Sequence, residues 1–356
     1  MHEALYLLDG YSLIYRSYFA FIRRPLRNPQ GQNSSAIFGF FRSLLSLFSQ
    51  RQPHRFLVVL DSRTPTFRHQ KYEDYKSTRD KTPEDLTAQI PIIEQMLEAL
   101  GVPMARVDGY EADDLIATLA ASCREREQPC YIVSGDKDLL QLVDGPIRVL
   151  RPGNNGFDDL DREGVYEDWG VYPEQILDYL ALTGDSSDNV PGVKGIGAKT
   201  AAKLLNQFGT LDAVYDHIDE IGGSVKTRLE QGRDSAYLSR DLVLLENSVP
   251  LDIPADRFQL PELNADLLEE LACLPVMVES AEVVTAEVDR ICSHPVGLSS
   301  HLDIELVTIG KNLIEGLSSF VEFTAKAMQF AARDRHPVAI AVVPGVVEGI
   351  EGLFEQ

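Results

Sequence analysis

The sequence predicts an α/β fold with a mostly parallel central sheet flanked by helices. Three short apolar runs, at residues 5–8, 56–60 and 131–133, are each followed by an aspartate. Helix-like stretches separate these runs, at residues 35–50, 84–100 and 111–127. Short buried strands that alternate with helices are typical of a parallel sheet whose two faces are both covered.

A second, smaller region begins near residue 172 and is predicted to be helical. Glycines punctuate it, and we expect helices at residues 198–208, 211–217 and 223–232. Beyond about residue 260 the pattern weakens to an acidic helix at 262–290 and one more strand at 337–343. We therefore expect an α/β domain at 1–172, a helical subdomain at 173–260 and an acidic C-terminal region at 261–356.

The charge of the chain is unevenly distributed. The formal net charge is −22, from 33 Lys and Arg against 55 Asp and Glu, which argues against a protein that coats nucleic acid through bulk positive charge. Residues 1–80 nevertheless carry 12 basic and 6 acidic side chains, whereas residues 242–356 carry 6 and 19. Most of the net negative charge, −13 of −22, thus lies in the last third, and basic contacts are expected from the first 80 residues.

The composition indicates a cytoplasmic globular protein with no membrane contact. No apolar stretch reaches the roughly 20 residues needed to span a bilayer, and the N-terminus lacks the pattern of a signal peptide. The four cysteines form no C-x-x-C pair, so we expect neither a disulfide framework nor a structural zinc site. With 44% hydrophobic and 25% charged residues, a disordered or coiled-coil protein is excluded.

Acidic residues follow the predicted strands, open the predicted helix at 111–127, or precede the glycine-rich part of the second region. They are Asp9, Asp61, Glu111, Asp113, Asp114, Asp136, Asp138, Asp185 and Asp188. Any single one fits an ordinary cap or surface residue, but the carboxyl ends of parallel strands meet at one edge, so we expect the acids to converge there. Two unit charges 4 Å apart repel by about 4 kcal/mol at an effective dielectric of 20, so several in one cleft need protons or cations. Oxygen ligands without His or Cys select Mg²⁺ or Mn²⁺, and two such ions would support phosphodiester cleavage.

A basic and aromatic segment at residues 67–79 is a candidate nucleic-acid contact. It interleaves Tyr75 with Lys76 and Arg79, and a helix would place the two cations on one face. Aromatic rings stack on unpaired bases, and cations hold phosphates. The alternative is an ordinary solvated helix with Tyr75 packed inward.

A glycine-rich segment at residues 192–200 allows three interpretations. It lacks the register of a G-x-G-x-x-G motif, and it departs from a Walker A loop because Ala198 separates Gly197 from Lys199 and no strand leads into it. The third interpretation is a helix–hairpin–helix turn, whose backbone N–H groups and following helix N-terminus bind a phosphate of duplex DNA. Its contacts would be Gly192, Lys194, Gly195, Gly197, Lys199 and Lys203. A plain glycine-rich linker between helices is the structural alternative.

Taken in order, these segments closely resemble the 5′-nuclease family. The motifs are LLDGYSLIYRSYFA, VVLDS, FRHQKYEDYKSTR, GYEADDLIATLA, VSGDKDLLQL and LTGDSSDNVPGVKGIGAKTAAKLL. They are similar to the 5′→3′ exonuclease domain at the N-terminus of bacterial DNA polymerase I, with flap endonucleases as relatives. The resemblance covers roughly residues 4–255.

The resemblance implies a PIN-like nuclease core with a helix–hairpin–helix (H3TH) subdomain, acting as a structure-specific, Mg²⁺-dependent 5′→3′ exonuclease and flap endonuclease on DNA. The first metal group of the family matches Asp9, Asp61, Glu111, Asp113 and Asp114, and the second matches Asp136, Asp138, Asp185 and Asp188. A helical arch beside the 5′ strand is implied near residues 66–90, and it matches Tyr75, Lys76 and Arg79, with Lys76 nearest the scissile phosphate. Arg16 fits a phosphate contact, and a K⁺ ion is implied at the glycine-rich turn.

The expected substrates are branched or nicked DNA with 5′ ends or flaps, and also RNA-primer 5′ ends. The expected process is DNA replication and repair, and the expected partner is a separate DNA polymerase. Two alternatives stay open. One is a non-catalytic DNA-binding module that recruits partners through its acidic tail, and the other is an RNA-cleaving nuclease. The C-terminal region, 261–356, departs from the family and has no assigned role.

Overall fold

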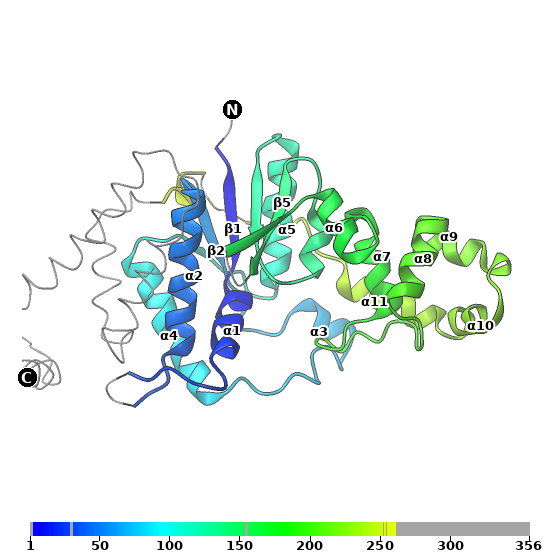
Figure 1. Ribbon diagram of the computed structural model, residues 1–356, viewed down its shortest axis with the longest axis horizontal. Coiled ribbons are helices and arrows are strands. Elements are labelled where there is room, and N and C mark those ends of the chain that lie inside the picture. The colour runs from blue at the N-terminus through cyan, green and yellow to red at the C-terminus, as the bar shows by residue number, and fades with distance from the viewer. Residues whose placement is uncertain (1–2, 29–30, 154–155, 252, 254, 261–356) are drawn as a thin grey trace, which may run out of the picture. The chain divides into compact units, whose positions relative to one another are not determined.

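The computed structural model describes residues 3–28, 31–153, 156–251, 253 and 255–260 (Figure 1). Most of them belong to one compact unit, which comprises residues 1–24 and 35–262. A second unit, residues 25–34 and 263–356, lies almost entirely outside the described residues. The helix expected at 262–290 and the strand expected at 337–343 therefore cannot be compared with the structure.

A six-stranded sheet forms the centre of the first unit and confirms the predicted α/β fold. Its strands, in spatial order, are β3 (Met104–Ala105), β2 (Arg55–Val59), β1 (Leu5–Asp9), β4 (Cys130–Val133), β5 (Ile147–Gly153) and β6 (Gly156–Leu160). All neighbours pair in parallel except β6, which runs antiparallel to β5. The chain moves outward from β1 to β3 and then returns to the other side of β1 as β4. A sheet of this kind has a crevice beyond the carboxyl ends of the strands where the order reverses, between β1 and β4.

Side chains are buried on both faces of the sheet, as expected for parallel strands. Leu5 and Leu7 of β1 belong to a core shared with α5 (Ala112–Glu125). Tyr6 and Leu8 alternate with them along the strand and are buried as well. Apolar layers therefore cover both faces of β1. This packing holds the strand, and with it the position of its last residue.

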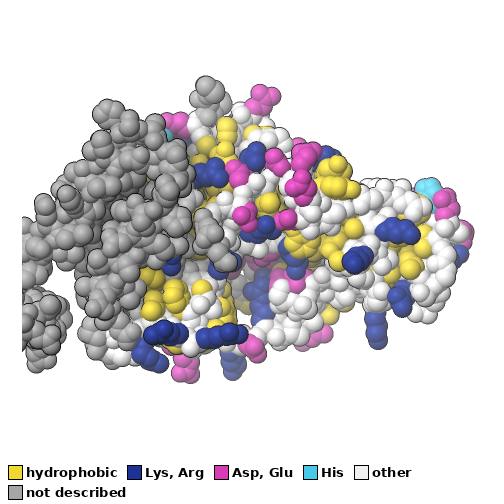
Figure 2. Space-filling model, viewed as in Figure 1, with side chains coloured by type: hydrophobic (Ala, Val, Ile, Leu, Met, Phe, Trp, Pro, Cys, Tyr) yellow, Lys and Arg dark blue, Asp and Glu magenta, His cyan; other side chains and the backbone are white. Residues whose placement is uncertain are grey.

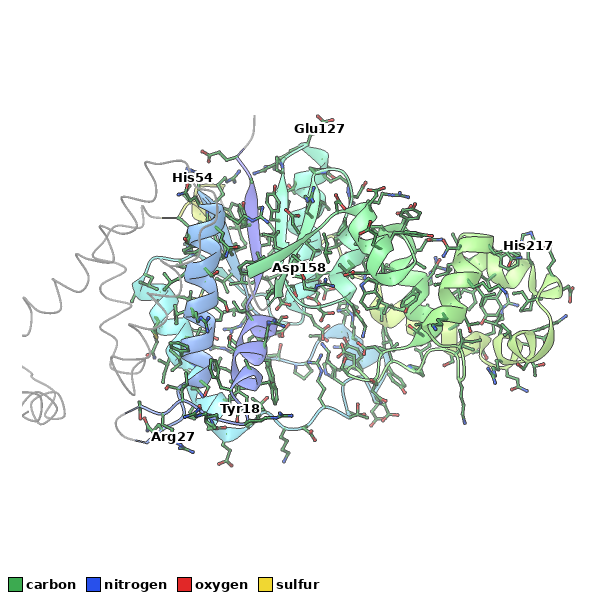
Figure 3. The ribbon with its side chains drawn as sticks, in the orientation of Figure 1. Tyr18, Arg27, His54, Glu127, Asp158 and His217 are labelled. Carbon is green, nitrogen blue, oxygen red and sulfur yellow. The ribbon has the colours of Figure 1, made fainter. Side chains whose placement is uncertain are left out.

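The other helices of the α/β part connect these strands. They are α1 (Gly10–Ala20), α2 (Ser35–Arg51), α3 (Phe67–Lys71), α4 (Glu84–Ala99), the 3₁₀ helix η1 (Asp138–Leu142) and α6 (Arg162–Trp169). α1 packs on α2, and α2 packs on α4. The hydroxyl of Tyr18, on α1 (Figure 3), donates to Asp85 of α4 over 2.8 Å. This bond ties the helix that follows β1 to the helix that follows the basic segment.

A helical subdomain follows the α/β part, as predicted. Its helices are α7 (Pro173–Thr183), α8 (Ala198–Phe208), α9 (Leu211–Asp216), α10 (Gly223–Gln231) and α11 (Arg233–Val243), with 3₁₀ turns η2 (Ile218–Glu220) and η3 (Ala255–Phe258). α7 packs on both η1 and α11, so the subdomain joins the α/β part next to the segment that follows β4. Within the described ranges, no helix is long and apolar enough to cross a membrane.

The turn between α7 and α8 depends on glycine at position 192. Gly192 has a φ of +59°, and a Cβ there would lie 2.3 Å from the backbone nitrogen of Gly184. We expect Gly192→Ala to lower the free energy of unfolding by at least about 2 kcal/mol, because it adds a backbone clash to an unfavourable φ. The control is Gly197→Ala, where φ is −101° and a Cβ meets nothing within 4 Å; it should cost about 1 kcal/mol or less. Urea unfolding measures both variants, and equal losses would contradict the role given to Gly192.

Candidate functional site

Acidic side chains gather at the crevice between β1 and β4. Asp9 is the last residue of β1, Asp61 follows β2 by two positions, and Asp136 follows β4 by three. The parallel register of β1 with β2 and with β4 places all three at the same edge of the sheet. The strand order thus brings together acids that are far apart in the sequence.

Backbone and hydroxyl donors hold the first of these acids in place. Asp9 caps α1, with Oδ1 accepting from the N–H of Ser12 over 3.1 Å, and its Oδ2 accepts from Ser134 Oγ over 2.8 Å. Asp61 Oδ1 accepts from the N–H of Ala112, the first residue of α5, over 2.9 Å. These bonds connect the segments after β1, β2 and β4 to helices that begin at the same edge.

The start of α5 supplies three further acids. Glu111 is the N-cap, and Asp113 and Asp114 lie in the first turn, where the helix dipole favours negative charge. Burial, followed by repulsion from Asp136 and Asp9, raises the pKa of Asp113 well above its usual range. Because Asp113 is repelled by acids that follow β1 and β4, the first turn of α5 and the strand ends share one cleft.

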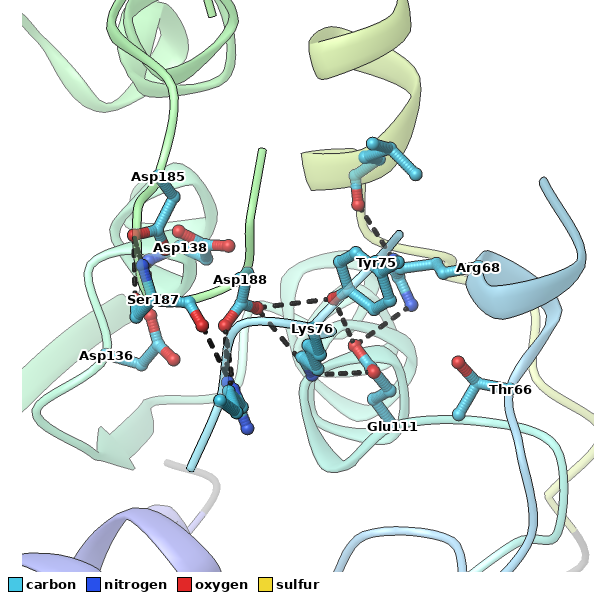
Figure 4. A network of polar contacts seen from close by, with 12 residues as sticks. Thr66, Arg68, Tyr75, Lys76, Glu111, Asp136, Asp138, Asp185, Ser187 and Asp188 are labelled. Carbon is cyan, nitrogen blue, oxygen red and sulfur yellow. Dashed lines mark hydrogen bonds and ion pairs between the residues drawn. The ribbon is translucent and has the colours of Figure 1, made fainter. Parts of the chain in front are cut away.

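A second group of acids lies where the α/β part meets the helical subdomain (Figure 4). Asp136 Oδ1 accepts from the N–H of Asp138 over 2.9 Å. In the loop after α7, Asp185 pairs with Lys137 Nζ at 2.9 Å. Burial, followed by repulsion from Asp136 and then from Asp188 and Asp185, raises the pKa of Asp138. The acids after β4 and those after α7 therefore face each other.

Burial and mutual repulsion destabilise the ionised form of several of these acids. Burial, followed by repulsion from Asp61, raises the pKa of Asp9 to about 7. Burial also raises the pKa of Asp61 and of Asp136. Oδ1 of Asp138 is buried without a hydrogen-bond partner among the residues that the structure describes. Cations relieve such a concentration of negative charge.

Basic side chains of the chain neutralise part of this charge. Lys76 Nζ lies 2.6 Å from Glu111 Oε1 and 3.6 Å from Asp188 Oδ2, and Arg79 also pairs with Asp188 (Figure 4). Burial lowers the pKa of Lys76, but attraction to Glu111 and Asp188 outweighs it and raises the pKa overall. Lys76 therefore keeps its charge at the border of the cleft.

The acids lie close together without forming a chelating group. In the described part of the chain, no three His, Cys, Asp or Glu side chains are arranged so that they could hold an ion together. Lys76, Arg79 and Lys137 each attract an acid to their own position. The acids are near enough to repel one another, and several of them are turned toward a basic partner.

The segment that carries Lys76 and Arg79 differs from the helix expected there. Residues 72–82 form turns between α3 and α4, and Lys76 has a φ of +58°. The backbone N–H of Lys76 donates to the carbonyl oxygen of Asp188 over 2.9 Å. The segment makes short turns and also bonds to the acidic loop after α7, so Lys76 and Arg79 reach one acid without sharing a helical face.

Tyr75 is buried, in contrast to the exposed ring expected for base stacking. Only 5% of the residue is exposed, and its ring belongs to the hydrophobic core. The hydroxyl donates to Glu111 Oε2 over 3.0 Å and to Asp188 Oδ2 over 3.3 Å. Tyr75 therefore packs inward, as in the alternative interpretation, but from a turn and not from the helix expected there, and it supports two acids of the cleft.

Asp114 has different surroundings from the other acids. It is completely buried, and its two oxygens each accept a 2.7 Å bond from Arg68. They also accept bonds from the N–H groups of Glu111 and Glu246. Arg68 was not identified from the sequence, because no local signal distinguishes an arginine that will be buried from the exposed cations beside it.

The glycine-rich turn presents the expected basic side chains to solvent. Lys194, Lys199 and Lys203 are exposed, whereas Val193 and Ile196 are buried beneath them. Lys and Arg side chains project from the surface over this subdomain in Figure 2. α8 begins at an N-cap glycine that makes no side-chain cap bond, so its first N–H groups suit an anion.

Comparison with known proteins links both parts of the fold to one family. Two family models match in succession: the N-terminal resolvase-like domain of 5′-3′ exonuclease at residues 4–170, and the C-terminal SAM fold of 5′-3′ exonuclease at residues 171–266. DNA polymerase I of Treponema pallidum is 48% identical over 280 residues, which are 78% of this chain and 27% of that protein. The chain thus spans less than a third of the length of that relative.

Two solved structures share the fold at low sequence identity. Bacteriophage T5 5′-exonuclease with bound zinc has a TM-score of 0.54 at 23% identity, covering 68% of this chain and 90% of its own. A complex of bacteriophage T5 flap endonuclease with DNA and metal ions has a TM-score of 0.53 at 21% identity, covering 81% and 99%. With both exonuclease models matched in order over residues 4–266, the chain belongs to the 5′-3′ exonuclease family.

Proposed function

We propose that the chain is a structure-specific 5′→3′ exonuclease and 5′-flap endonuclease that hydrolyses DNA with divalent cations, in replication and repair. The observation that carries the proposal is the cleft beside β1 and β4, where acids from five chain segments repel one another and Lys76 and Arg79 border them. Phosphodiester hydrolysis develops negative charge on the phosphate and on the departing oxygen, and a site that combines bound cations with basic side chains stabilises both.

The acidic cleft fits divalent cations through the chemistry of its donors. Every candidate ligand is a carboxylate, and Asp138 contributes a buried oxygen without a hydrogen-bond partner among the described residues. Such donors favour hard ions, so we propose Mg²⁺ or Mn²⁺. The first ion would be held by Asp9, Asp61, Glu111 and Asp113, and the second by Asp136, Asp138, Asp185 and Asp188. Asp114 is excluded because Arg68 and backbone N–H groups take both of its oxygens.

When bound, two such ions supply activation of the attacking water and stabilisation of the departing 3′ oxygen. Basic side chains of the chain would also stabilise negative charge on the substrate. Lys76 and Arg79 pair with Glu111 and Asp188, which are themselves proposed ligands. Ligation would free these basic side chains for the substrate, and we propose that Lys76 then contacts the scissile phosphate and Arg79 the same strand.

The helical subdomain is proposed to hold the duplex next to the cleavage site. Gly192, Gly195 and Gly197 let the backbone of the turn approach a phosphate, and Lys194, Lys199 and Lys203 add charge. Arg16, exposed on α1, is proposed as a further phosphate contact.

The K⁺ ion proposed at this turn would use only part of the turn's backbone. The carbonyl oxygen of Gly192 accepts from Ser235 Oγ over 2.7 Å, and that of Gly195 accepts from Arg228 over 3.0 Å. The ion would therefore bind through other carbonyl oxygens of the segment.

We propose that catalysis and duplex binding are carried by different parts of the fold. Residues 1–172 would carry the catalytic cleft and residues 173–260 the duplex-binding subdomain, a division supported by the boundary between the two family models at residues 170 and 171. The acidic region 261–356 lies outside the described residues. The proposed substrates are nicked or branched DNA and RNA-primer 5′ ends, with a separate DNA polymerase as partner.

An end-labelled 5′-flap duplex incubated with the protein and Mg²⁺ tests the proposed function. Cleavage near the junction of single strand and duplex is the expected result. Parallel DNA-tipped and RNA-tipped flaps show whether RNA is the preferred substrate. Flap binding without cleavage in Mg²⁺ or Mn²⁺ would overturn the nuclease proposal in favour of a DNA-binding module.

Asp138→Asn should abolish most cleavage and leave flap binding intact. The change keeps the shape of the side chain but removes the charge that a cation needs, and we expect roughly a hundredfold loss of kcat or more. Asp168→Asn is the control, because Asp168 is an exposed acid that pairs with Arg151 outside the cleft. Wild-type cleavage by Asp138→Asn would contradict the ligand assignment.

The metal-free protein should lose stability as the pH rises from about 4 to about 7. The pKa of Asp9 is raised to about 7, whereas an unfolded aspartate titrates near 3.9. Protonated Asp9 therefore stabilises the fold fully below about pH 4, and this stabilisation is lost as the pH rises through 7. Urea unfolding in EDTA measures this loss, which Asp9→Asn should reduce and Mg²⁺ at pH 7 should reverse. Equal pH profiles for wild type and Asp9→Asn would contradict the assignment.

Lys76→Met should slow turnover without preventing folding. The substitution keeps an unbranched side chain that is one atom shorter and removes the charge proposed to face the scissile phosphate, so we expect kcat to fall by roughly a hundredfold. Lys81→Ala, at an exposed neighbouring lysine, is the control and should cleave at the wild-type rate. Single-turnover cleavage of the flap measures both variants, and a normal rate for Lys76→Met would remove its proposed role.

A further inference from the structure

A buried arginine joins three chain segments behind the acidic cleft. The side chain of Arg68, on α3, is 1% exposed. Its guanidinium donates to the two carboxylate oxygens of Asp114 over 2.7 Å each. It also donates to the carbonyl oxygens of Leu242 and Leu244, over 2.8 Å in both cases. One side chain thus connects the helix before the Lys76 turn, the first turn of α5 and the segment that leaves α11.

Asp114 completes this junction from the other side. Its Oδ2 accepts from the N–H of Glu111 over 3.1 Å, and its Oδ1 accepts from the N–H of Glu246 over 2.9 Å. The segment after α11 is further tied to α5 by the hydroxyl of Thr118, which accepts from the N–H of Val249 over 3.1 Å. The planar fork of an arginine is needed to bridge these groups, because a lysine offers a single point charge.

Stability alone does not account for a buried ion pair at this place. A charge pair removed from water costs desolvation energy, and apolar side chains of similar volume are often as stable or more so. Burial lowers the pKa of Arg68, but its bonds and attraction to Asp114, together with attraction to Glu111, raise the pKa overall. The pair contacts Glu111 from two sides. Asp114 accepts a hydrogen bond from the N–H of Glu111, and Arg68 Nη1 lies 3.4 Å from Glu111 Oε2.

We propose that Arg68 and Asp114 are positioning residues that orient Glu111 for cleavage and couple α3, α5 and the segment after α11 into one rigid junction. The inference rests on the proposed nuclease function. Neither residue contacts the substrate. Through this pair, the turn that carries Lys76 and the last helix of the duplex-binding subdomain are attached to the helix that carries two acids of the cleft.

Three variants test the proposal on a 5′-flap substrate. Arg68→Lys keeps the charge but loses the fork, and we expect kcat to fall about 10- to 100-fold with KM within about threefold of wild type. The double variant Arg68→Met with Asp114→Leu removes both buried charges together but leaves four backbone groups without partners. It should therefore unfold at a lower urea concentration than wild type, stay folded without urea, and cleave as slowly as Arg68→Lys. Arg148→Lys is the control: Arg148 pairs with Asp159 at 2.6 Å, away from the acids of the cleft, and its kcat should not change.

Calorimetric titration with Mg²⁺ gives a second readout that does not depend on cleavage. The folded double variant should bind Mg²⁺ at least about tenfold more weakly than wild type, because Glu111 loses its orientation. Wild-type kcat or wild-type Mg²⁺ affinity in the folded double variant would overturn the proposal, as would a loss of kcat that only follows the fraction unfolded. Absence of cleavage by the wild-type protein would instead refute the proposed function, and the titration would still decide the role of Arg68.

Discussion

Repulsion among carboxylates at one edge of the sheet is the constraint on which the rest of the structure depends. The strand order brings Asp9 and Asp136 to the crevice between β1 and β4, and α5 adds Asp113 from its first turn. Buried strands on either side fix these positions, so distance cannot relieve the repulsion. The fold has three remaining ways to compensate, which are protonation, basic side chains and bound cations. Burial and repulsion from Asp61 raise the pKa of Asp9 and so favour the first, and the pairing of Lys76 with Glu111 shows the second.

The basic side chains that compensate this charge also connect parts of the chain that are distant in sequence. Lys76 links the turn after α3 to α5 and to the loop after α7. Lys137, which lies between two acids of the cleft, reaches Asp185 in that same loop. Arg68 joins α3 to α5 and to the end of α11. The negative charge that defines the cleft therefore also ties the basic segment to α5 and to the helical subdomain, in addition to the apolar packing of α7 on η1.

The sheet and the helical subdomain could be predicted because their signals are local. Short apolar runs that end in aspartate indicate strands, and a helix bounded by glycines at both ends is visible in residues 197–209. Prediction failed for residues 72–82, where the partner lies elsewhere. The N–H of Lys76 bonds to Asp188, and the ring of Tyr75 enters the core. A segment whose bonds are made to a distant loop does not show its conformation in its own sequence.

By itself, the sequence determined which side chains are available to the site, since nine acids and their basic neighbours stand in recognisable local motifs. Only the tertiary structure decided which of these groups are buried and which partner each one has. It assigned Asp114 to a buried arginine, Tyr75 to the core and Lys137 to Asp185. The physical reason is that burial and pairing arise from contacts across the fold. The bond from Arg68 to the carbonyl of Leu242 spans 174 positions, and no local pattern encodes a partner at that distance.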